Sequence, residues 1–287
     1  MLAWALPILV AAQTFTIATL NTESGSDTQS FRVAELIREL GRVEIWAFQE
    51  VASEEAVIEF TVAASASGAR QRYRYHLSTS GENHDMHREN DHIAIVYNST
   101  QFREVESTEL HAIRSIDGAG RLGKPEWHLR GALLVRFQHI KTGIEFYVGN
   151  VHLKCCAASD DPRRHGPDIR AHQARLLKDW IERSDVPVIL TGDLNIPIKP
   201  TSANGNGSSL AFRTLSEIMT WHRPSNPVKT FCGHLFDSML DHVFSLTDST
   251  LRVNAVEIGQ PHEAYCERDE QGYPDHRPVF AEVELTP

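Results

Sequence analysis

The sequence predicts an α/β fold in which two mostly antiparallel sheets pack face to face and helices cover their outer faces. Short apolar runs rich in β-branched and aromatic residues recur along the whole chain, which is typical of strands. A few segments with apolar residues at helical spacing lie between these runs. No linker rich in proline or glycine divides the 287 residues. We therefore expect layers packed around one core, in one domain over residues 13–287.

The expected strands are the short apolar runs bounded by polar or turn residues. They are residues 15–20, 45–48, 93–97, 132–137, 146–151, 186–190, 241–244, 251–258 and 279–285. Three polar stretches between them, 78–91, 157–168 and 200–209, have the composition of loops. Long loops on a rigid scaffold are where a substrate surface is commonly built.

Three segments predict helices. Residues 27–40 place Phe31, Leu36 and Leu40 among apolar residues at helical spacing, and Gly41 supplies a stop. Ser53 is a suitable N-cap for the next helix. Residues 169–181 carry an apolar face made of Leu176, Leu177, Trp180 and Ile181. These helices are expected to cover the sheets.

The composition is that of a folded globular protein, with 41% hydrophobic and 23% charged residues. The formal net charge of −10 should repel polyanions, which argues against tight, static binding of DNA. It argues little against fast hydrolysis of DNA, because a local basic patch or a bound divalent cation can attract the substrate. The charge also fits a small anionic substrate or a lipid headgroup.

Residues 1–12 are almost wholly apolar, and a cut after Ala12 would resemble a secretory cleavage site. The segment is too short to span a bilayer, which takes about 20 apolar residues. No Lys or Arg precedes it, and a buried N-terminal segment is the alternative. We expect a secreted or periplasmic protein with no transmembrane span.

Cysteine usage is compatible with export. Cys155, Cys156, Cys232 and Cys266 are an even number without the close CxxC pairs of a zinc site. Adjacent Cys155 and Cys156 do not easily pair with each other, so each would need a distant partner. Two disulfides would fit an extracellular protein, and buried thiols are the alternative. The sequence leaves the pairing open.

Polar groups suited to metal or phosphate chemistry follow or precede many of the expected strands. Each alone is more often a turn residue, a cap or a hydrogen-bonded histidine. Together they predict one site, provided that these strand ends meet at one edge of the sandwich. The residues are Asn21, Glu50, His152, Asp193, Asn195, Asp241, Asp275 and His276.

These residues lie in ordered motifs that resemble those of the endonuclease/exonuclease/phosphatase superfamily, the fold family of DNase I. The motifs are Ala-Thr-Leu-Asn at 18–21, Ala-Phe-Gln-Glu-Val at 47–51, Asn-Val-His-Leu-Lys at 150–154, Thr-Gly-Asp-Leu-Asn at 191–195, Leu-Asp-His-Val at 240–243 and Pro-Asp-His-Arg-Pro-Val at 274–279. The resemblance runs from about residue 15 to residue 285. It implies a four-layered α/β sandwich with the site at one sheet edge, and a metal-dependent phosphoesterase activity of a secreted bacterial type.

The resemblance also implies a metal site. Glu50 is the expected principal ligand, with Asn21 beside it and Asp275 completing the shell. Glu23 is near enough in sequence to contribute. The ion is expected to be Mg²⁺, with Mn²⁺ or Ca²⁺ as alternatives, because hard divalent cations prefer oxygen ligands and offset the negative charge of a phosphodiester.

Catalytic roles follow from the same resemblance. Asp193 resembles the residue that orients or deprotonates the attacking water, and Asn195 fixes that carboxylate or the phosphate. His276 resembles the imidazole that contacts the scissile phosphate, with Asp241 as its partner. Such a pairing would raise the pKa of the imidazole and fix its tautomer. His152 resembles a second catalytic imidazole.

Arg130 and Lys154 are the expected phosphate-binding residues, although each is almost as well explained as a solvated surface residue. The leading functional hypothesis is a secreted nuclease that hydrolyses phosphodiester bonds. The alternatives are a lipid phosphodiesterase of the sphingomyelinase type and a phosphomonoesterase. A non-catalytic binding domain is disfavoured, because it should have lost some of the site residues. No stable protein partner is implied.

Overall fold

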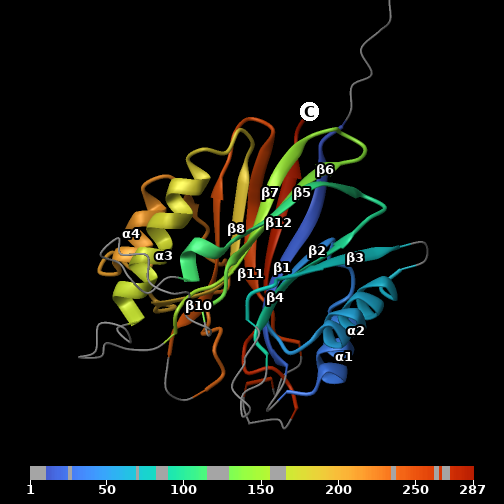
Figure 1. The fold of residues 1–287 in the computed structure, drawn as a ribbon, viewed down its shortest axis with the longest axis horizontal. Helices are drawn as coiled ribbons and strands as arrows, with labels where there is room; N and C mark the ends of the chain where they lie inside the picture. The colour runs from blue at the N-terminus through green and yellow to red at the C-terminus, as the bar shows by residue number, and fades with distance from the viewer. Residues whose placement is uncertain are drawn as a thin grey trace, which may run out of the picture.

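The computed structural model describes residues 11–24, 28–68, 71–81, 90–114, 129–155, 166–233, 237–261, 265–266 and 272–287 (Figure 1). The expected leader at residues 1–12 lies outside this part of the chain, apart from its last two residues. Cys156 lies outside it as well. None of the helices in the described ranges is both long and apolar enough to cross a membrane.

The chain forms two six-stranded sheets. The first sheet has the order β11-β12-β1-β2-β4-β3, with bounds Leu251–Ile258, Val279–Leu285, Gln13–Ser24, Ile45–Val51, His92–Asn98 and Tyr73–Leu77. The second has the order β5-β6-β7-β8-β10-β9, with bounds Phe102–Leu110, Ala132–His139, Glu145–His152, Val188–Ile198, Met239–Leu246 and Thr220–Trp221. Each sheet has one parallel pair, β1–β2 and β7–β8, and its other pairs are antiparallel. The expectation of mostly antiparallel sheets is confirmed.

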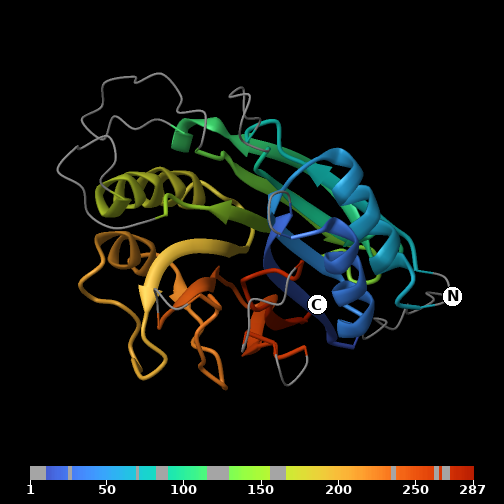
Figure 2. The same ribbon diagram turned by 90° about the horizontal axis from the view of Figure 1, so that it is seen from below.

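Helices lie on both outer sides of the sandwich, as Figure 2 shows from below. α1 (Ser30–Leu40) and α2 (Glu54–Ser65) cover the first sheet, and α3 (Gly166–Ile181) and α4 (Leu210–Ser216) cover the second. A short 3₁₀ helix, η1, spans His111–Arg114. α2 begins at the expected cap, because the Ser53 hydroxyl accepts a hydrogen bond from the Ala56 N–H. The four-layered architecture is therefore confirmed.

The core occupies the three spaces between the four layers. One cluster fills the space between the two sheets and continues under α3 and α4, and a second lies between the first sheet and α1 and α2. Aromatic rings link β1, β5 and β7, since Phe15 lies 4.9 Å from Phe102 and 5.5 Å from Phe146 between centroids. Side chains packed this closely hold the layers in fixed relative positions.

The structure differs from the sequence-based expectation in elements that lack an apolar run. β5 was missed because it is an edge strand with charged and polar residues, most of them exposed. β3, α4 and the two-residue β9 were missed as well. α1 begins at Ser30 rather than residue 27, and Phe31 is 43% exposed although it is one of the apolar residues at helical spacing. Local patterns do not reveal which face tertiary packing will cover.

A buried hydrogen-bond network joins the two sheets. Gln49 of β2 donates to the side-chain oxygen of Asn150 on β7 at 2.7 Å. The Asn150 amide in turn donates to the carbonyl oxygens of Phe48 and Ala94, each at 2.8 Å. Gln49 and Asn150 are fully buried. The network therefore links β2 and β4 of the first sheet to β7 of the second.

Replacing Asn150 with Ala should lower the free energy of unfolding by about 1–3 kcal/mol, because two buried carbonyl groups and the Gln49 amide lose a partner. Urea unfolding followed by circular dichroism measures this value. Asn254→Ala is the control, since Asn254 makes side-chain hydrogen bonds on the surface, and its effect should stay within about 0.5 kcal/mol. Equal effects of the two substitutions would contradict a special role for the network.

Candidate active site

Strand pairing brings the predicted site residues to one edge of the sandwich. In the second sheet, Asp193 is paired in register with His152 on one side and with Asp241 on the other. In the first sheet, Asn21 lies beside Gln49, the residue before Glu50. The two parallel pairs thus end at the same edge, as expected from the sequence.

Strained backbone marks the same place. Glu23, Glu50 and Asn195 have φ angles of 41°, 54° and 51°, a left-handed region that non-glycine residues seldom occupy. Gly192 has φ 140°, and a Cβ atom there would lie 2.0 Å from the Val151 carbonyl oxygen. Such strain is commonly found where side chains must be aimed at a functional centre.

Asp193 is the centre of the cluster and is 2% exposed. One carboxylate oxygen, Oδ2, lies 3.3 Å from the Asn21 amide nitrogen, 3.4 Å from His152 Nε2 and 3.9 Å from His276 Nε2. The other, Oδ1, accepts a hydrogen bond of 2.9 Å from the backbone N–H of Asn195. Burial, followed by repulsion from the Asp241 carboxylate, raises the pKa of Asp193 to about 7. The group can therefore take up and release a proton near neutral pH.

His276 and Asp241 form a buried ion pair. His276 Nδ1 lies 2.8 Å from Asp241 Oδ2. Asp241 belongs to β10 of the second sheet, and His276 lies in the segment that leads into β12 of the first sheet. Burial alone would lower the pKa of His276, but the carboxylates of Asp241, Asp193 and Asp275 outweigh it and hold the pKa well above its ordinary value. His276 is therefore a cation that presents Nε2 toward Asp193.

His152 has the opposite electrostatic setting. Burial, followed by the positive charges of Arg130 and His276, holds the pKa of His152 well below its ordinary value, so the ring is neutral. Its Nε2 lies 3.7 Å from a Glu50 carboxylate oxygen. The two imidazoles around Asp193 thus differ in charge.

Asp91 is a site residue that the sequence analysis did not identify. Its carboxylate forms an ion pair with the Arg130 guanidinium and lies 3.9 Å from Nδ1 of His152. Asp91 comes at the end of a polar stretch in which no signal distinguishes one carboxylate from another. The feature that could have identified Asp91 is its position directly before β4, which is the neighbour of β2 in the sheet.

The remaining predicted residues lie at different distances from this centre. Arg130 is buried and joined to it through Asp91. The Asn195 side-chain amide donates to the Leu153 carbonyl at 3.1 Å. Glu23 donates its backbone N–H to the Asn21 side-chain oxygen. Lys154 is half-buried, and in the described part of the chain its ammonium group forms no ion pair. The structure thus does not bring Lys154 into the cluster through such a contact.

The residues present fit a divalent cation. The carboxylates of Asp193 and Asp241 offer ligand oxygens that lie within 4.8 Å of each other and of a ring nitrogen of His276. The protonated His276 ring is itself no ligand, so the carboxylates are the donors here. Asp241 Oδ1 is buried and has no hydrogen-bond partner within the described ranges. Repulsion from Glu50 also contributes to the raised pKa of Asp193 and of Asp275, after the larger effect of burial. A cation would neutralise this excess of negative charge.

Glu50 and Asp275 border the cluster on its more open side, and Asn21 is buried beside Glu50. The Asn21 amide donates to Glu50 Oε1 at 2.8 Å. The side chains of Glu50 and Asp275 are 32% and 37% exposed, in contrast to Asp193 and Asp241. Partly exposed carboxylates are better placed than buried ones to share a cation with waters and substrate oxygens. The two predicted carboxylate ligands, Glu50 and Asp275, thus lie on the side where substrate can reach them.

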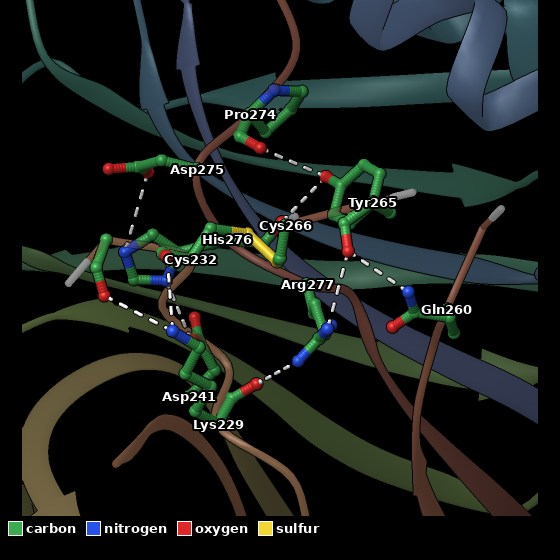
Figure 3. Close-up of a disulfide and its surroundings, with 11 residues drawn as sticks. Lys229, Cys232, Asp241, Gln260, Tyr265, Cys266, Pro274, Asp275, His276 and Arg277 are labelled. Carbon is green, nitrogen blue, oxygen red and sulfur yellow. Dashed lines mark hydrogen bonds and ion pairs between the residues drawn. A yellow bond between two sulfur atoms is a disulfide. The ribbon is translucent and has the colours of Figure 1, made fainter. Parts of the chain in front are cut away.

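A disulfide lies beside the site. Cys232 and Cys266 are bonded, 34 residues apart, and Figure 3 shows the bond next to His276 and Tyr265. Of the pairings that the sequence left open, the structure forms the one between Cys232 and Cys266, so neither of these is a partner for Cys155 or Cys156. One disulfide agrees with the expected export.

The four-layered sandwich and the carboxylate and imidazole cluster at its edge define a phosphoesterase. The chain belongs to the Endonuclease/Exonuclease/phosphatase family, whose model matches residues 18–263. This match confirms the expected family. No curated protein matches the chain significantly.

Solved structures share the DNase I-like fold. A family member from Bacteroides vulgatus superposes with a TM-score of 0.67 at 18% identity, covering 95% of this chain and 99% of the other. A mannosyl-6-phosphatase from Bacteroides thetaiotaomicron has a TM-score of 0.62 at 19% identity, over 94% and 99% of the two chains. ANGEL2, a 2',3'-cyclic phosphatase, has a TM-score of 0.63 at 15% identity, over 97% and 98%.

Asp193→Asn should stabilise the protein at alkaline pH when divalent cations are removed with EDTA. Folding raises the pKa of Asp193 from 3.8 to about 7, so the wild-type protein loses stability as the pH rises through this window. At about pH 8 the variant should be more stable by about 1 kcal/mol or more, because one pKa unit corresponds to about 1.4 kcal/mol. Urea unfolding at about pH 4.5 and about pH 8 measures the difference. A gain of the same size at both pH values would show that packing, and not charge, causes it.

Proposed function

We propose that the protein is a divalent-metal-dependent phosphodiesterase that hydrolyses nucleic acid outside the cytoplasm. The observation that carries this proposal is the Asp193 carboxylate, buried between a cationic and a neutral imidazole. A phosphodiester needs a base for the attacking water, positive charge for the phosphoryl oxygens and a proton for the leaving oxygen. The cluster offers one group for each need.

Asp193 is the proposed base. Its pKa of about 7 lets it accept a proton from water at neutral pH. The Asn195 N–H and the Asn21 amide hold the two carboxylate oxygens in place. Asn195 thus positions the base, as the family resemblance implies.

His276, kept protonated by Asp241, is proposed to face a non-bridging oxygen of the phosphate through its Nε2. Its charge is present before substrate binds, which avoids reorganisation during the reaction. Arg130 supplies a second buried positive charge, held by Asp91. His152 is neutral, and it is proposed to donate a ring N–H hydrogen bond to the leaving oxygen, which takes its proton from the cationic His276 or from solvent. Lys154, at the rim, is proposed to contact phosphate farther along the substrate.

The proposed metal ligands are Glu50, Asn21 and Asp275. When bound, a divalent cation supplies Lewis-acid stabilisation of the charge that develops on the phosphate. The Asn21 amide orients Glu50 by a hydrogen bond of 2.8 Å. The buried atoms of Asp193, Asp241 and His276 lie behind these ligands, and Mg²⁺ is the proposed ion, with Mn²⁺ or Ca²⁺ as alternatives.

Nucleic acid is the proposed substrate because two imidazoles, His152 and His276, flank the base, as the resemblance to DNase-like members of the family implies. A phosphomonoester of a small molecule is the second candidate. The net charge of −10 favours it, and one structural relative is named a mannosyl-6-phosphatase. Another relative is named a 2',3'-cyclic phosphatase, which supports the phosphodiester. The Cys232–Cys266 disulfide and the small residues before Gln13 support the proposed export.

Hydrolysis of plasmid DNA, bis-p-nitrophenyl phosphate, sphingomyelin and a sugar phosphate should be compared with Mg²⁺, Mn²⁺, Ca²⁺ or EDTA. DNA nicking and diester cleavage are expected with Mg²⁺ or Mn²⁺ and should disappear with EDTA. Cleavage of the sugar phosphate alone would replace nucleic acid by the second candidate. Activity that persists in EDTA would overturn the metal proposal.

Glu50→Gln should lower kcat/KM by about a thousandfold or more, because it removes a charged metal ligand while keeping the shape of the side chain. His276→Asn should cost about a hundredfold or more. Glu54→Gln is the matched control on the surface of α2, where the carboxylate binds only the Tyr75 hydroxyl among described residues. It should stay within about twofold of the wild type. Full turnover by Glu50→Gln or His276→Asn, in folded protein, would refute these roles.

A further inference from the structure

The loop that carries Asp275 and His276 is held by backbone contacts on one side. The Cys232 N–H donates to the Asp275 carbonyl at 2.6 Å, and the Arg277 N–H donates to the Thr230 carbonyl at 2.8 Å. Phe231 and His276 form an isolated antiparallel bridge. Residues 230–232 thus form a short strand-like partner for residues 275–277, which we name the support segment.

The support segment also reaches the partner of His276. The Thr230 hydroxyl accepts hydrogen bonds from the N–H groups of Leu240 at 2.8 Å and Asp241 at 3.3 Å. Thr230 is fully buried. The support segment therefore lies between the two chain segments that must place Asp241 and His276 within hydrogen-bond distance.

Tyr265 holds the same loop from another side. Tyr265 is 2% exposed, and its hydroxyl lies 2.9 Å from the His276 carbonyl oxygen and 3.2 Å from that of Pro274. Figure 3 shows the hydroxyl between these carbonyls. The Tyr265 carbonyl accepts hydrogen bonds from the side chains of Gln260 at 3.0 Å and Arg277 at 3.4 Å. The carbonyl oxygens of Pro274 and His276, one on each side of Asp275, thus share one hydroxyl as their hydrogen-bond partner.

The disulfide joins these two supports. Cys232 belongs to the support segment, and Cys266 follows Tyr265 directly. Arg277 adds a second link, since its guanidinium donates to the carbonyls of Lys229 at 2.8 Å and of Tyr265. Both cysteines are half-buried, so a small dithiol can reach the bond. Breaking it would leave Tyr265 attached by its own hydrogen bonds and packing.

We propose that Tyr265 is a positioning residue for Asp275 and His276, and that the Cys232–Cys266 disulfide holds it, so that full turnover requires the oxidised protein. The proposal rests on the proposed function of the site, because it states what the site needs to work. Reduction by a dithiol transfers two electrons and two protons to the cysteine pair, cleaves the S–S bond and converts the dithiol to its own disulfide.

Turnover of the wild-type protein should be measured before and after treatment with dithiothreitol, beside the double variant Cys232→Ser/Cys266→Ser. On bis-p-nitrophenyl phosphate with saturating Mg²⁺, reduction should lower kcat by about tenfold and leave KM within about twofold, because misplacement affects the chemical step more than binding. The double variant should show the low kcat with and without dithiothreitol. If both reduced and double-variant proteins keep kcat within about twofold, the disulfide has no such role.

Tyr265→Phe tests the hydroxyl without touching the cysteines. It should lower kcat by about tenfold with little change in KM. Tyr75→Phe is the matched control, because its hydroxyl binds Glu54 on the surface of α2, and its kcat should equal that of the wild type. Near-ultraviolet circular dichroism confirms that each protein is folded. An unchanged kcat in folded Tyr265→Phe would overturn the positioning role.

A readout independent of turnover separates this proposal from the proposed function. The ring nitrogen resonances of His276, assigned with His276→Asn, should shift on reduction and in Tyr265→Phe, while those of His139 on β6 should not. If the wild-type protein hydrolyses no substrate, the proposed function fails but these resonances still test the positioning. Unshifted His276 resonances in both cases would overturn it.

Discussion

The hydrogen bond between Gln49 and Asn150 crosses from the first sheet to the second next to the candidate site. Gln49 precedes Glu50, and Asn150 lies two residues before His152 on the same strand. The bond therefore helps to hold a proposed metal ligand and a proposed catalytic imidazole, which belong to different sheets, near each other. It acts together with the Asn21–Asp193 hydrogen bond and the His276–Asp241 ion pair, which also join groups of the two sheets at this edge.

The same edge concentrates charge in a dry environment. Five carboxylates meet there, and the positive charges of His276 and Arg130 balance only part of them; the carboxylates are Glu50, Asp91, Asp193, Asp241 and Asp275. Burial and mutual repulsion raise the pKa of Asp193 and Asp275, which is a cost to the folded state. The surrounding core and the disulfide offset such a cost, as is usual for sites that trade stability for function.

Much of this arrangement was predictable because it follows from strand ends. Polar residues directly after apolar runs identified Asn21, Glu50 and Asp193, and the motif order indicated the family and the four layers. Asp91 was not predictable, since its role depends on where β4 lies in the sheet, and strand order is a long-range property. β5 has no apolar run, and its pairing with β6 is decided by packing. The disulfide partner of Cys232 likewise depends on tertiary proximity.

The strand orders of the two sheets repeat one plan. The run β1-α1-β2-α2-β3-β4 and the run β7-α3-β8-α4-β9-β10 have the same sequence of elements and the same neighbours within their sheets. The hairpin after each run, β5-β6 or β11-β12, joins the sheet of the other run beside β7 or β1. Each half of the chain thus completes the sheet of its counterpart. The two halves are interlocked, so neither contains a finished sheet or a whole site, and the catalytic edge exists only once both have folded together.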